Sequence, residues 1–253
     1  MKLSGNTIFI TGGGSGIGRG LAEALHKLGN KVIIAGRRRN RLDAVIAANP
    51  GIEAVELDIT DPKGIKQVAV KLIAEYPDLN VLINNAGIML PDAVAGTIDD
   101  ALMVDTITTN LMGPIRMTSA LIEHLKRKPE AVVAYTSSVL GFVPLAATAV
   151  YSSTKAAVHS FVLSQRFMLR DTTVRVLEIA PPWVRTELMN SQEAKQAMPL
   201  EQFIEETMVV LGTDADEILI DAAKPLRANA GPNEHGLVNG FNAQMMAIFA
   251  GRE

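Results

Sequence analysis

Short apolar runs alternate with segments of helical periodicity along most of the sequence, and this alternation strongly constrains the fold. Between the runs, apolar residues recur every three or four positions, as at Ile17, Leu21, Leu25 and Leu28. Strands separated by helices pair in parallel, and the helices cover both faces of the resulting sheet. The sequence therefore predicts an α/β fold with a doubly wound parallel sheet. The expected strands are 7–10, 32–35, 54–57, 81–83, 132–135 and 174–179.

No repeat, low-complexity tract or linker divides the 253 residues, so we expect a single domain spanning residues 1–253. The formal charge of −3 argues against broad electrostatic capture of nucleic acid or of an anionic membrane, and it favours a small-molecule substrate. The absence of cysteine excludes disulfides and thiolate metal sites. The N-terminus has no signal-peptide pattern, so we expect a cytoplasmic location.

A glycine-rich turn, with the sequence TGGGSGIG, joins the first expected strand to the first expected helix. Free backbone N–H groups and the helix dipole favour a pyrophosphate at such a position, and glycines let the backbone approach it closely. The alternative is a flexible turn without a ligand. We expect a dinucleotide to be bound here by Gly12, Ser15, Gly16, Ile17 and Gly18.

Three arginines follow the second expected strand, at the place where such folds bind the adenosine ribose. An acidic residue there would bind the two ribose hydroxyls of NAD, but none is present. Arginines suit the 2'-phosphate of NADP through charge-assisted hydrogen bonds. We therefore expect NADP(H) to be preferred, bound by Arg37 and Arg38. NAD(H) stays possible, because an arginine-rich loop can also be merely solvated.

Two further turns lie at the expected ligand-binding edge. Asp58 follows the third strand beside Ile59 and is placed to accept a hydrogen bond from the adenine amino group; it could equally be a turn aspartate. Asn85, Ala86 and Gly87 follow the fourth strand and form a small polar turn that can pass close to a cofactor. Taken alone, this second segment indicates only a loop.

Tyr151 and Lys155 lie four residues apart at the expected start of a helix, so both point to one face of it. A free tyrosine titrates near ~10, and acid–base work near neutrality requires its pKa to fall by about 3 units. A neighbouring ammonium supplies part of such a shift. The same spacing also occurs by chance on many helices.

Together and in this order, TGGGSGIG, NNAG, Ser138, YSSTK and a proline-rich turn after the sixth strand resemble the short-chain dehydrogenase/reductase family over residues 1 to about 187. The resemblance implies a Rossmann-like sheet, a homo-oligomer (dimer or tetramer) and hydride transfer between a nicotinamide and a carbonyl or alcohol. It implies that Ser138 holds the substrate oxygen and that Tyr151 exchanges its proton. Lys155 would bind the ribose and lower the tyrosine pKa. Asn110 would complete the catalytic set.

The sequence adds a physical reason for the role of Asn110. Pro114 lies four residues later in an expected helix and has no N–H to offer the Asn110 carbonyl. That carbonyl is then free for a water molecule. The family's proton relay runs from the tyrosine through the ribose and lysine to such a water.

The turn after the sixth strand departs from the family pattern, because Pro181 is followed by Pro182 where the family commonly has glycine. The fixed proline torsion can shape the nicotinamide pocket differently. The resemblance still assigns Pro181, Val184 and Thr186 to the cofactor. Trp183 either lines the substrate site or caps the sheet.

The family's Asp-Gly-Gly motif after a seventh strand is missing, so the sequence does not favour that strand or the tetramer contacts that use it. A C-terminal helix with Met245, Met246, Ile248 and Phe249 is the alternative. Residues 187–230 form the region that varies with substrate in this family. Its acidic run, 214–217, is interpreted as a solvated helix start. The four histidines have no pairwise metal spacing, and no chemistry is assigned to them.

The stretch 139–150 joins Ser138 to Tyr151 without a charged residue. So much apolar loop must be covered by protein, a partner subunit or a ligand. We expect it to form an apolar wall of the pocket, which favours an apolar ketone or secondary alcohol; the alternative is that it only packs beneath a helix. The alternatives in function are a 3-oxoacyl-type reductase and a non-catalytic NAD(P)-binding regulator.

Overall fold

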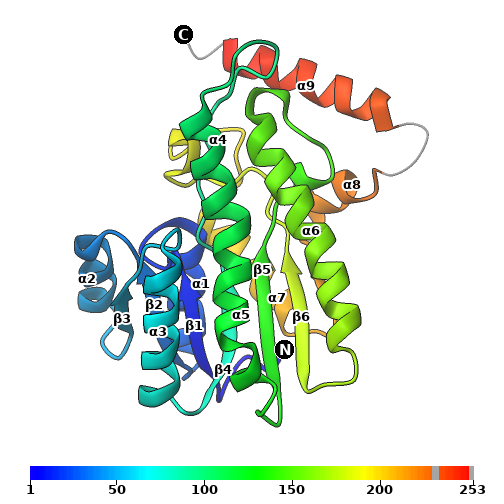
Figure 1. Cartoon of the computed structure of the whole chain (residues 1–253). Coiled ribbons are helices and arrows are strands. Elements are labelled where there is room, and N and C mark those ends of the chain that lie inside the picture. Colours follow the sequence, from blue (N-terminus) through cyan, green and yellow to red (C-terminus); the bar gives the residue numbers. More distant parts are fainter. Residues whose placement is uncertain (230–233, 251–253) are drawn as a thin grey trace.

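A parallel sheet of seven strands forms the centre of the computed structural model, which describes residues 1–229 and 234–250 (Figure 1). The strand order is β3-β2-β1-β4-β5-β6-β7, and every neighbouring pair is parallel. The predicted doubly wound α/β fold is confirmed. The strands are β1 (Thr7–Thr11), β2 (Lys31–Gly36), β3 (Glu53–Glu56), β4 (Leu79–Asn84), β5 (Ala131–Thr136), β6 (Val174–Ile179) and β7 (Glu217–Ile218).

Helices cover both faces of this sheet. In Figure 1, α3, α5 and α6 lie in front of the strands, and α1 and α7 lie behind them. Alternate residues of each strand face the two layers: Ile8 and Ile10 pack with Leu21 of α1, whereas Phe9 packs with the α3 and α5 side. This alternation follows from the two-residue period of a strand. The helices are α1 (Gly16–Lys27), α2 (Arg39–Ala48), α3 (Pro62–Glu75), α4 (Asp100–Ile107), α5 (Gly113–Leu125), α6 (Ala149–Leu169), α7 (Leu200–Leu211), α8 (Lys224–Arg227) and α9 (Glu234–Ala250).

The helix departs from regular α geometry between α4 and α5, just before Pro114. The segment Thr108–Met112 is a π-helix, and the Gly113 N–H bonds to the Thr108 carbonyl five residues back. A proline cannot continue the normal ladder, and a wider π turn is one way for a helix to pass it. Asn110 lies inside this widened turn.

The expectation against a seventh strand is wrong. Glu217 and Ile218 form β7, in register with Glu178 and Ile179 of β6. The acidic run before it is therefore not a helix start; Arg175 binds the Asp216 carboxylate at 3.1 Å and the Asp214 carbonyl at 3.0 Å beside the edge of the sheet. A strand of two residues is too short to show periodicity in sequence.

The expected C-terminal helix is present as α9, which crosses the top of Figure 1 beside the loop that precedes α6. Its Asn242 side chain donates to the Pro144 carbonyl at 2.9 Å and accepts from the Ala146 N–H. The region 187–230 runs through α7, β7 and α8, and its last residue lies outside the described part of the chain. Within the described residues, none of the helices combines the length and apolar character needed to cross a membrane.

Candidate active site

Four polar side chains lie near one another beyond the carboxyl ends of β4 and β5. Ser138 follows β5, Tyr151 and Lys155 lie in the first turns of α6, and Asn110 lies in the π turn. All four are buried, with at most 7% of each residue exposed. Groups far apart in sequence thus share one enclosed site, which is the usual position for a ligand in an open parallel sheet.

Burial dominates the electrostatics of Tyr151 and Lys155. It raises the pKa of Tyr151 to about 12, against the opposing effect of a hydrogen bond with Ser138. It lowers the pKa of Lys155 to about 8, against the charge of Glu178. The expected lowering of the tyrosine pKa is therefore not seen. Desolvation disfavours both charged forms.

Lys155 is held in place by the backbone of β5. Its Nζ donates to the Thr136 carbonyl at 2.8 Å and lies 5.4 Å from the centre of the Tyr151 ring. A Cβ on Gly87 would stand 3.8 Å from this Nζ and 3.3 Å from Asn110 Oδ1. The turn at Gly87 therefore borders the site; an added Cβ would be tight against Asn110 and in ordinary contact with Lys155.

The Asn110 side chain is used to fix the turn after β4. Its Oδ1 accepts from the Ile88 N–H at 2.9 Å, and its Nδ2 donates to the Ile88 carbonyl at 2.8 Å. Thr154 Oγ1 accepts from the same Nδ2 at 3.3 Å. The side chain thus ties the turn after β4 to α6.

The N-terminus of α1 fits a phosphate group. Ser15 at the N-cap makes no side-chain capping hydrogen bond, and the first turn carries no acidic residue. The free N–H groups and the helix dipole therefore remain available for an anion. Gly12 and Gly16 have φ values of 70° and 53°, which favour glycine. Thr186 lies against Gly16, at ordinary contact distance from where a Cβ would stand.

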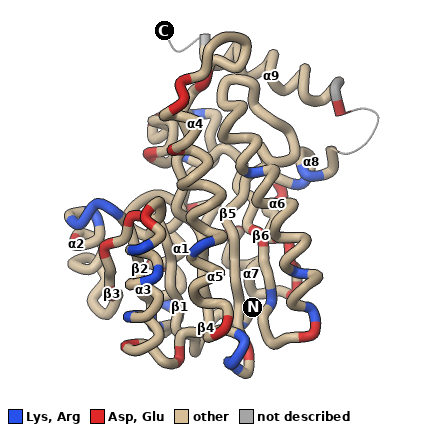
Figure 2. Tube along the Cα trace, viewed as in Figure 1, with Lys and Arg blue, Asp and Glu red and all other residues tan. Residues whose placement is uncertain are grey.

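The arginines after β2 lie beside this turn and form the basic patch at the start of α2 in Figure 2. Arg38 Nη2 donates to Ser15 Oγ at 3.2 Å. Arg38 and Arg41 both pair with Glu187, at 3.5 Å and 2.9 Å. Arg37 instead lies near enough to Asp58 to help lower its pKa. Arg38 thus contacts the turn expected to hold phosphate through Ser15, and Arg41 lies against Gly14 of the same turn.

Sequence reasoning missed Arg41 and Glu187. With Ser15 and Arg19 they line a cavity of about 290 Å³ beside the start of α1. Arg41 lies two residues after the last arginine of the run 37–39, so its position in sequence could have indicated it. Glu187 gives no comparable signal, because only the fold brings it to α2.

Asp58 and Ile59, which are also expected to bind the cofactor, lie at the same edge of the sheet but differ in solvent exposure. Burial raises the pKa of Asp58, but hydrogen bonds from Thr60 and the charge of Arg37 outweigh it, so the net shift is downward. Asp58 Oδ1 accepts from both the Thr60 N–H and its hydroxyl. Ile59 is 6% exposed and packs against Gly113. Asp58 is thus accessible at the edge, whereas Ile59 mainly fills the core.

The turn after β4 is tied to the glycine-rich turn. Thr11 Oγ1 accepts from the backbone N–H groups of Asn85 and Ala86, at 3.0 Å and 3.1 Å. The Asn85 side chain donates to the Thr11 and Gly12 carbonyls and accepts from Thr136. These hydrogen bonds fix the relative positions of β1, β4 and β5. The polar groups of the Asn85 side chain therefore bond within the protein.

The turn after β6 lies against the serine loop. The Pro181 carbonyl accepts from the Val139 N–H at 3.0 Å, and Val184 is buried and bridges to Met198. Trp183 Nε1 donates to Ser191 at 2.9 Å, and its ring packs edge-on against Phe249 of α9. Trp183 therefore joins the substrate region to the C-terminal helix.

The apolar loop 139–150 is covered largely by protein. Phe142 and Val143 pack with Ala180, and residues of α8 and α9 pack against them, among them Val238 and Phe241. A cavity of about 460 Å³ remains between this loop, α6 and α9. Its α6 lining comes from Ala149, Ser152, Ser153 and Ala156, on a different side of the helix from Tyr151. Part of the loop 139–150 thus packs beneath helices, as in the alternative to an apolar pocket wall.

A glycine turn feeding an uncapped helix, placed beside a buried tyrosine and lysine at the carboxyl edge of a parallel sheet, defines an NAD(P)-dependent oxidoreductase. Residues 6–197 match the protein family described as short chain dehydrogenase. The chain belongs to this family.

Individual relatives agree with this assignment. The chain is 42% identical to DltE of Bacillus subtilis (strain 168), described as an uncharacterized oxidoreductase, over 78% of this chain and 79% of that protein. It is 36% identical to an NADP-dependent 3-hydroxy acid dehydrogenase of Schizosaccharomyces pombe, over 74% of each. A short chain dehydrogenase of Burkholderia cenocepacia J2315, solved with NADP, superposes with a TM-score of 0.78 at 26% identity, over 99% of this chain and 98% of that one.

Proposed function

We propose that the protein is a carbonyl reductase or alcohol dehydrogenase that prefers NADP(H) and acts on an apolar ketone or secondary alcohol. The observation that carries the proposal is the burial of Ser138, Tyr151, Lys155 and Asn110 in one site at the carboxyl edge of the sheet. The nicotinamide supplies or accepts the hydride when bound. The chain's own residues hold the substrate oxygen and handle the proton.

In this proposal Ser138 donates a hydrogen bond to the substrate oxygen and Tyr151 gives or takes its proton. Lys155 binds the ribose, and its charge opposes the rise in the tyrosine pKa caused by burial. The Asn110 carbonyl holds the water at the end of the relay. Each role matches a position in the family motif, and the enclosure of the four groups keeps bulk water from the proton transfer.

The preference for NADP(H) rests on the arginines after β2. Arg38 lies at the glycine-rich turn, and Arg41 lines the adjacent cavity. No acidic residue stands at the end of β2 to bind the ribose hydroxyls of NAD. Two guanidinium groups beside an uncapped helix start favour an additional phosphate.

The preference for an apolar substrate rests on the walls of the site. The loop from Ser138 to Tyr151 carries no charge, and Leu140 within it stays partly exposed. Arg185, in the expected substrate region, bonds to the backbone. Its Nε donates to the Ala194 and Ala197 carbonyls, and its Nη2 donates to the Lys195 carbonyl. It is therefore not presented to a substrate carboxylate. A hydroxy acid is the second candidate, because one relative is a 3-hydroxy acid dehydrogenase.

We also propose that the protein forms a homo-oligomer through the outer face of α4 and α6. Leu163, Phe167 and Met168 on α6 are 44%, 63% and 73% exposed, and Val104 and Ile107 on α4 are exposed as well. So many large apolar side chains on neighbouring helices favour burial against a second copy.

The test is NADPH oxidation with three groups of substrates: ketones of rising apolar size, charged keto acids, and sugars. We expect kcat/KM to rise with apolar size, by up to about fourfold for each methylene that is buried, since one methylene contributes ~0.8 kcal/mol. A preference for keto acids would support the second candidate, and inactivity on all carbonyls would contradict the proposal.

Tyr151→Phe links this activity to the site. We expect kcat to fall by at least about 100-fold while NADPH binding persists, because general acid catalysis typically contributes 10²–10⁴-fold. Tyr135→Phe is the matched control. It removes another buried hydroxyl, which bonds to Thr118 and Gln165. A Tyr151→Phe enzyme with near wild-type turnover would exclude the acid assignment.

A further inference from the structure

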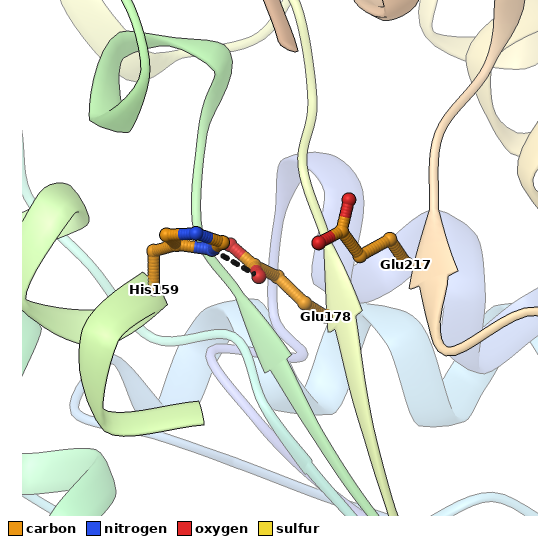
Figure 3. Close-up of side chains that lie close together, drawn as sticks. All are labelled: His159, Glu178 and Glu217. Atoms are coloured by element: carbon orange, nitrogen blue, oxygen red, sulfur yellow. Dashed lines mark hydrogen bonds and ion pairs between the residues drawn. The ribbon is translucent and has the colours of Figure 1, made fainter. Parts of the chain in front are cut away.

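Two glutamates stand side by side beneath α6. Glu178 of β6 and Glu217 of β7 are in register on parallel strands, and Figure 3 shows both side chains beside His159 of α6. Glu178 is only 1% exposed. Adjacent like charges on neighbouring strands repel each other, and a buried carboxylate needs compensation.

Cations and hydrogen bonds compensate this pair unequally. Arg227 of α8 binds both oxygens of Glu217 at 2.8 Å in a bidentate ion pair. His159 Nδ1 lies 2.7 Å from Glu178 Oε2. Among the described residues, Glu178 Oε1 is buried without a hydrogen-bond partner. Both oxygens of Glu217 are therefore paired, whereas only one oxygen of Glu178 has a partner among the described residues.

The cluster does not suit a metal ion. The nearest ligand atoms of His159, Glu178 and Glu217 lie within 4.8 Å of one another, close enough for three ligands. However, Arg227 already occupies both oxygens of Glu217, and its charge opposes a second cation. The charge of Glu178 acts on Arg227 as well, and it also reaches a second cationic group.

That group is Lys155. It lies one helical turn before His159, so both side chains point to the same face of α6. Its Nζ bonds to Thr136, which is in register with Ile179, the residue after Glu178. The Glu178 charge favours the ammonium form of Lys155 against its burial.

We propose that Glu178, anchored by His159, is a positioning residue that keeps Lys155 charged and in place for the reaction. This inference rests on the proposed function, in which Lys155 acts as an ammonium. Phe142 couples the cluster to the serine loop: its ring packs edge-on against His159 at 5.0 Å and beneath Arg227 at 4.7 Å. The cluster thus joins the helix that carries Lys155 to the loop that carries Ser138.

The predicted pH effect has a definite sign. Burial alone lowers the pKa of Lys155, and the Glu178 anion raises it, with a net value of about 8. Removing the anion with Glu178→Gln therefore lets the ammonium lose its proton at lower pH. The titratable and charged groups near Lys155 are Tyr151 on α6 and Glu178 on β6. Those around the two glutamates are His159 and Arg166 on α6 and Arg227 on α8.

The test is the pH profile of kcat/KM for ketone reduction. We expect Glu178→Gln to move the alkaline limb down by about 1 pH unit, the size typical of a nearby opposite charge. Glu217→Gln is the matched control, since it removes the neighbouring carboxylate that is paired with Arg227, and its limb should stay in place. A Glu178→Gln profile that superimposes on the wild type would overturn the proposal.

Two further measurements keep the result decisive. If Glu178→Gln does not fold, Glu178→Asp is used instead, because it retains the charge but places it one methylene further from Lys155. We expect its alkaline limb to shift down by less than that of Glu178→Gln, and Glu217→Asp to show no shift. Equal pH profiles for the two aspartate variants would refute the role of Glu178. The pH dependence of NADPH binding is followed in parallel by fluorescence. A shifted binding profile in a protein that reduces no carbonyl would reject the proposed function while supporting the effect of Glu178 on Lys155.

Discussion

At the scale of single residues, the site depends on burial acting against charge. Tyr151 and Lys155 lie within one helical turn, yet burial moves both pKa values toward the neutral forms. The opposing groups are Ser138, which bonds to the tyrosine, and Glu178, which favours the ammonium. The residues that adjust the reactive pair are therefore as important to the site as the pair itself.

The first prediction concerns cofactor choice. We expect Arg37→Ala combined with Arg38→Ala to raise KM for NADPH by roughly tenfold or more, and KM for NADH far less, because a charge-assisted hydrogen bond contributes about 1.5–3 kcal/mol. Arg39→Ala is the control, since Arg39 pairs with Asp43 one turn along α2. Steady-state kinetics with both cofactors measures the effect. An equal rise for NADPH and NADH would show that these arginines do not bind the 2'-phosphate.

At the scale of elements, the serine loop is seated directly on the helix that carries the reactive pair. A Cβ on Gly141 would stand 2.9 Å from the Lys155 carbonyl carbon and 3.0 Å from its oxygen. Backbone atoms cannot move away from an added Cβ as the end of a flexible side chain can. The close contact between Gly141 and α6 therefore sets the distance between Ser138 and the pair on α6.

The second prediction follows from this contact. We expect Gly141→Ala to destabilise the protein by about 1–3 kcal/mol, as overpacking typically does, and to lower kcat by displacing Ser138. Gly240→Ala in α9 is the control, because no heavy atom lies within 4 Å of its added Cβ and alanine favours a helix. Urea unfolding and turnover are measured for both. Unchanged stability of Gly141→Ala would mean that the loop is not seated on α6 in this way.

At the scale of the whole molecule, an exposed apolar helical surface and the candidate active site lie in different places. The outer surface of α4 and α6 presents large apolar side chains, and α9 closes the carboxyl edge of the sheet beside the serine loop. The apolar helical face is thus separate from the candidate active site.

The third prediction tests this face. We expect Leu163→Glu combined with Phe167→Glu to dissociate the proposed oligomer, because charged side chains in a packed interface are costly. Val209→Glu on α7 is the control; Val209 is 73% exposed on the other side of the sheet. Sedimentation velocity gives the mass of each variant. A double variant with the same mass as the wild type would contradict the assignment of the interface.

The sequence by itself determined the alternation of strands and helices, the glycine-rich turn, and the positions of Ser138, Tyr151 and Lys155. These features are local: periodicity, turn chemistry and helical spacing are set by residues that are near neighbours in the chain. The hydrogen bond that Pro114 cannot donate to the Asn110 carbonyl was indicated in the same way, because it joins residues four positions apart. The π turn itself was not predicted.

Only the tertiary structure decided the seventh strand, the coverage of the apolar loop by α8 and α9, and the groups around the basic turn. Glu187 reaches Arg38 and Arg41 from a distant segment, and His159 meets Glu178 only because α6 lies across β6. A two-residue strand has no measurable period, and a histidine has no pairing signal before the sheet forms. Such contacts join residues far apart in the chain, and their energies depend on burial that exists only in the folded protein.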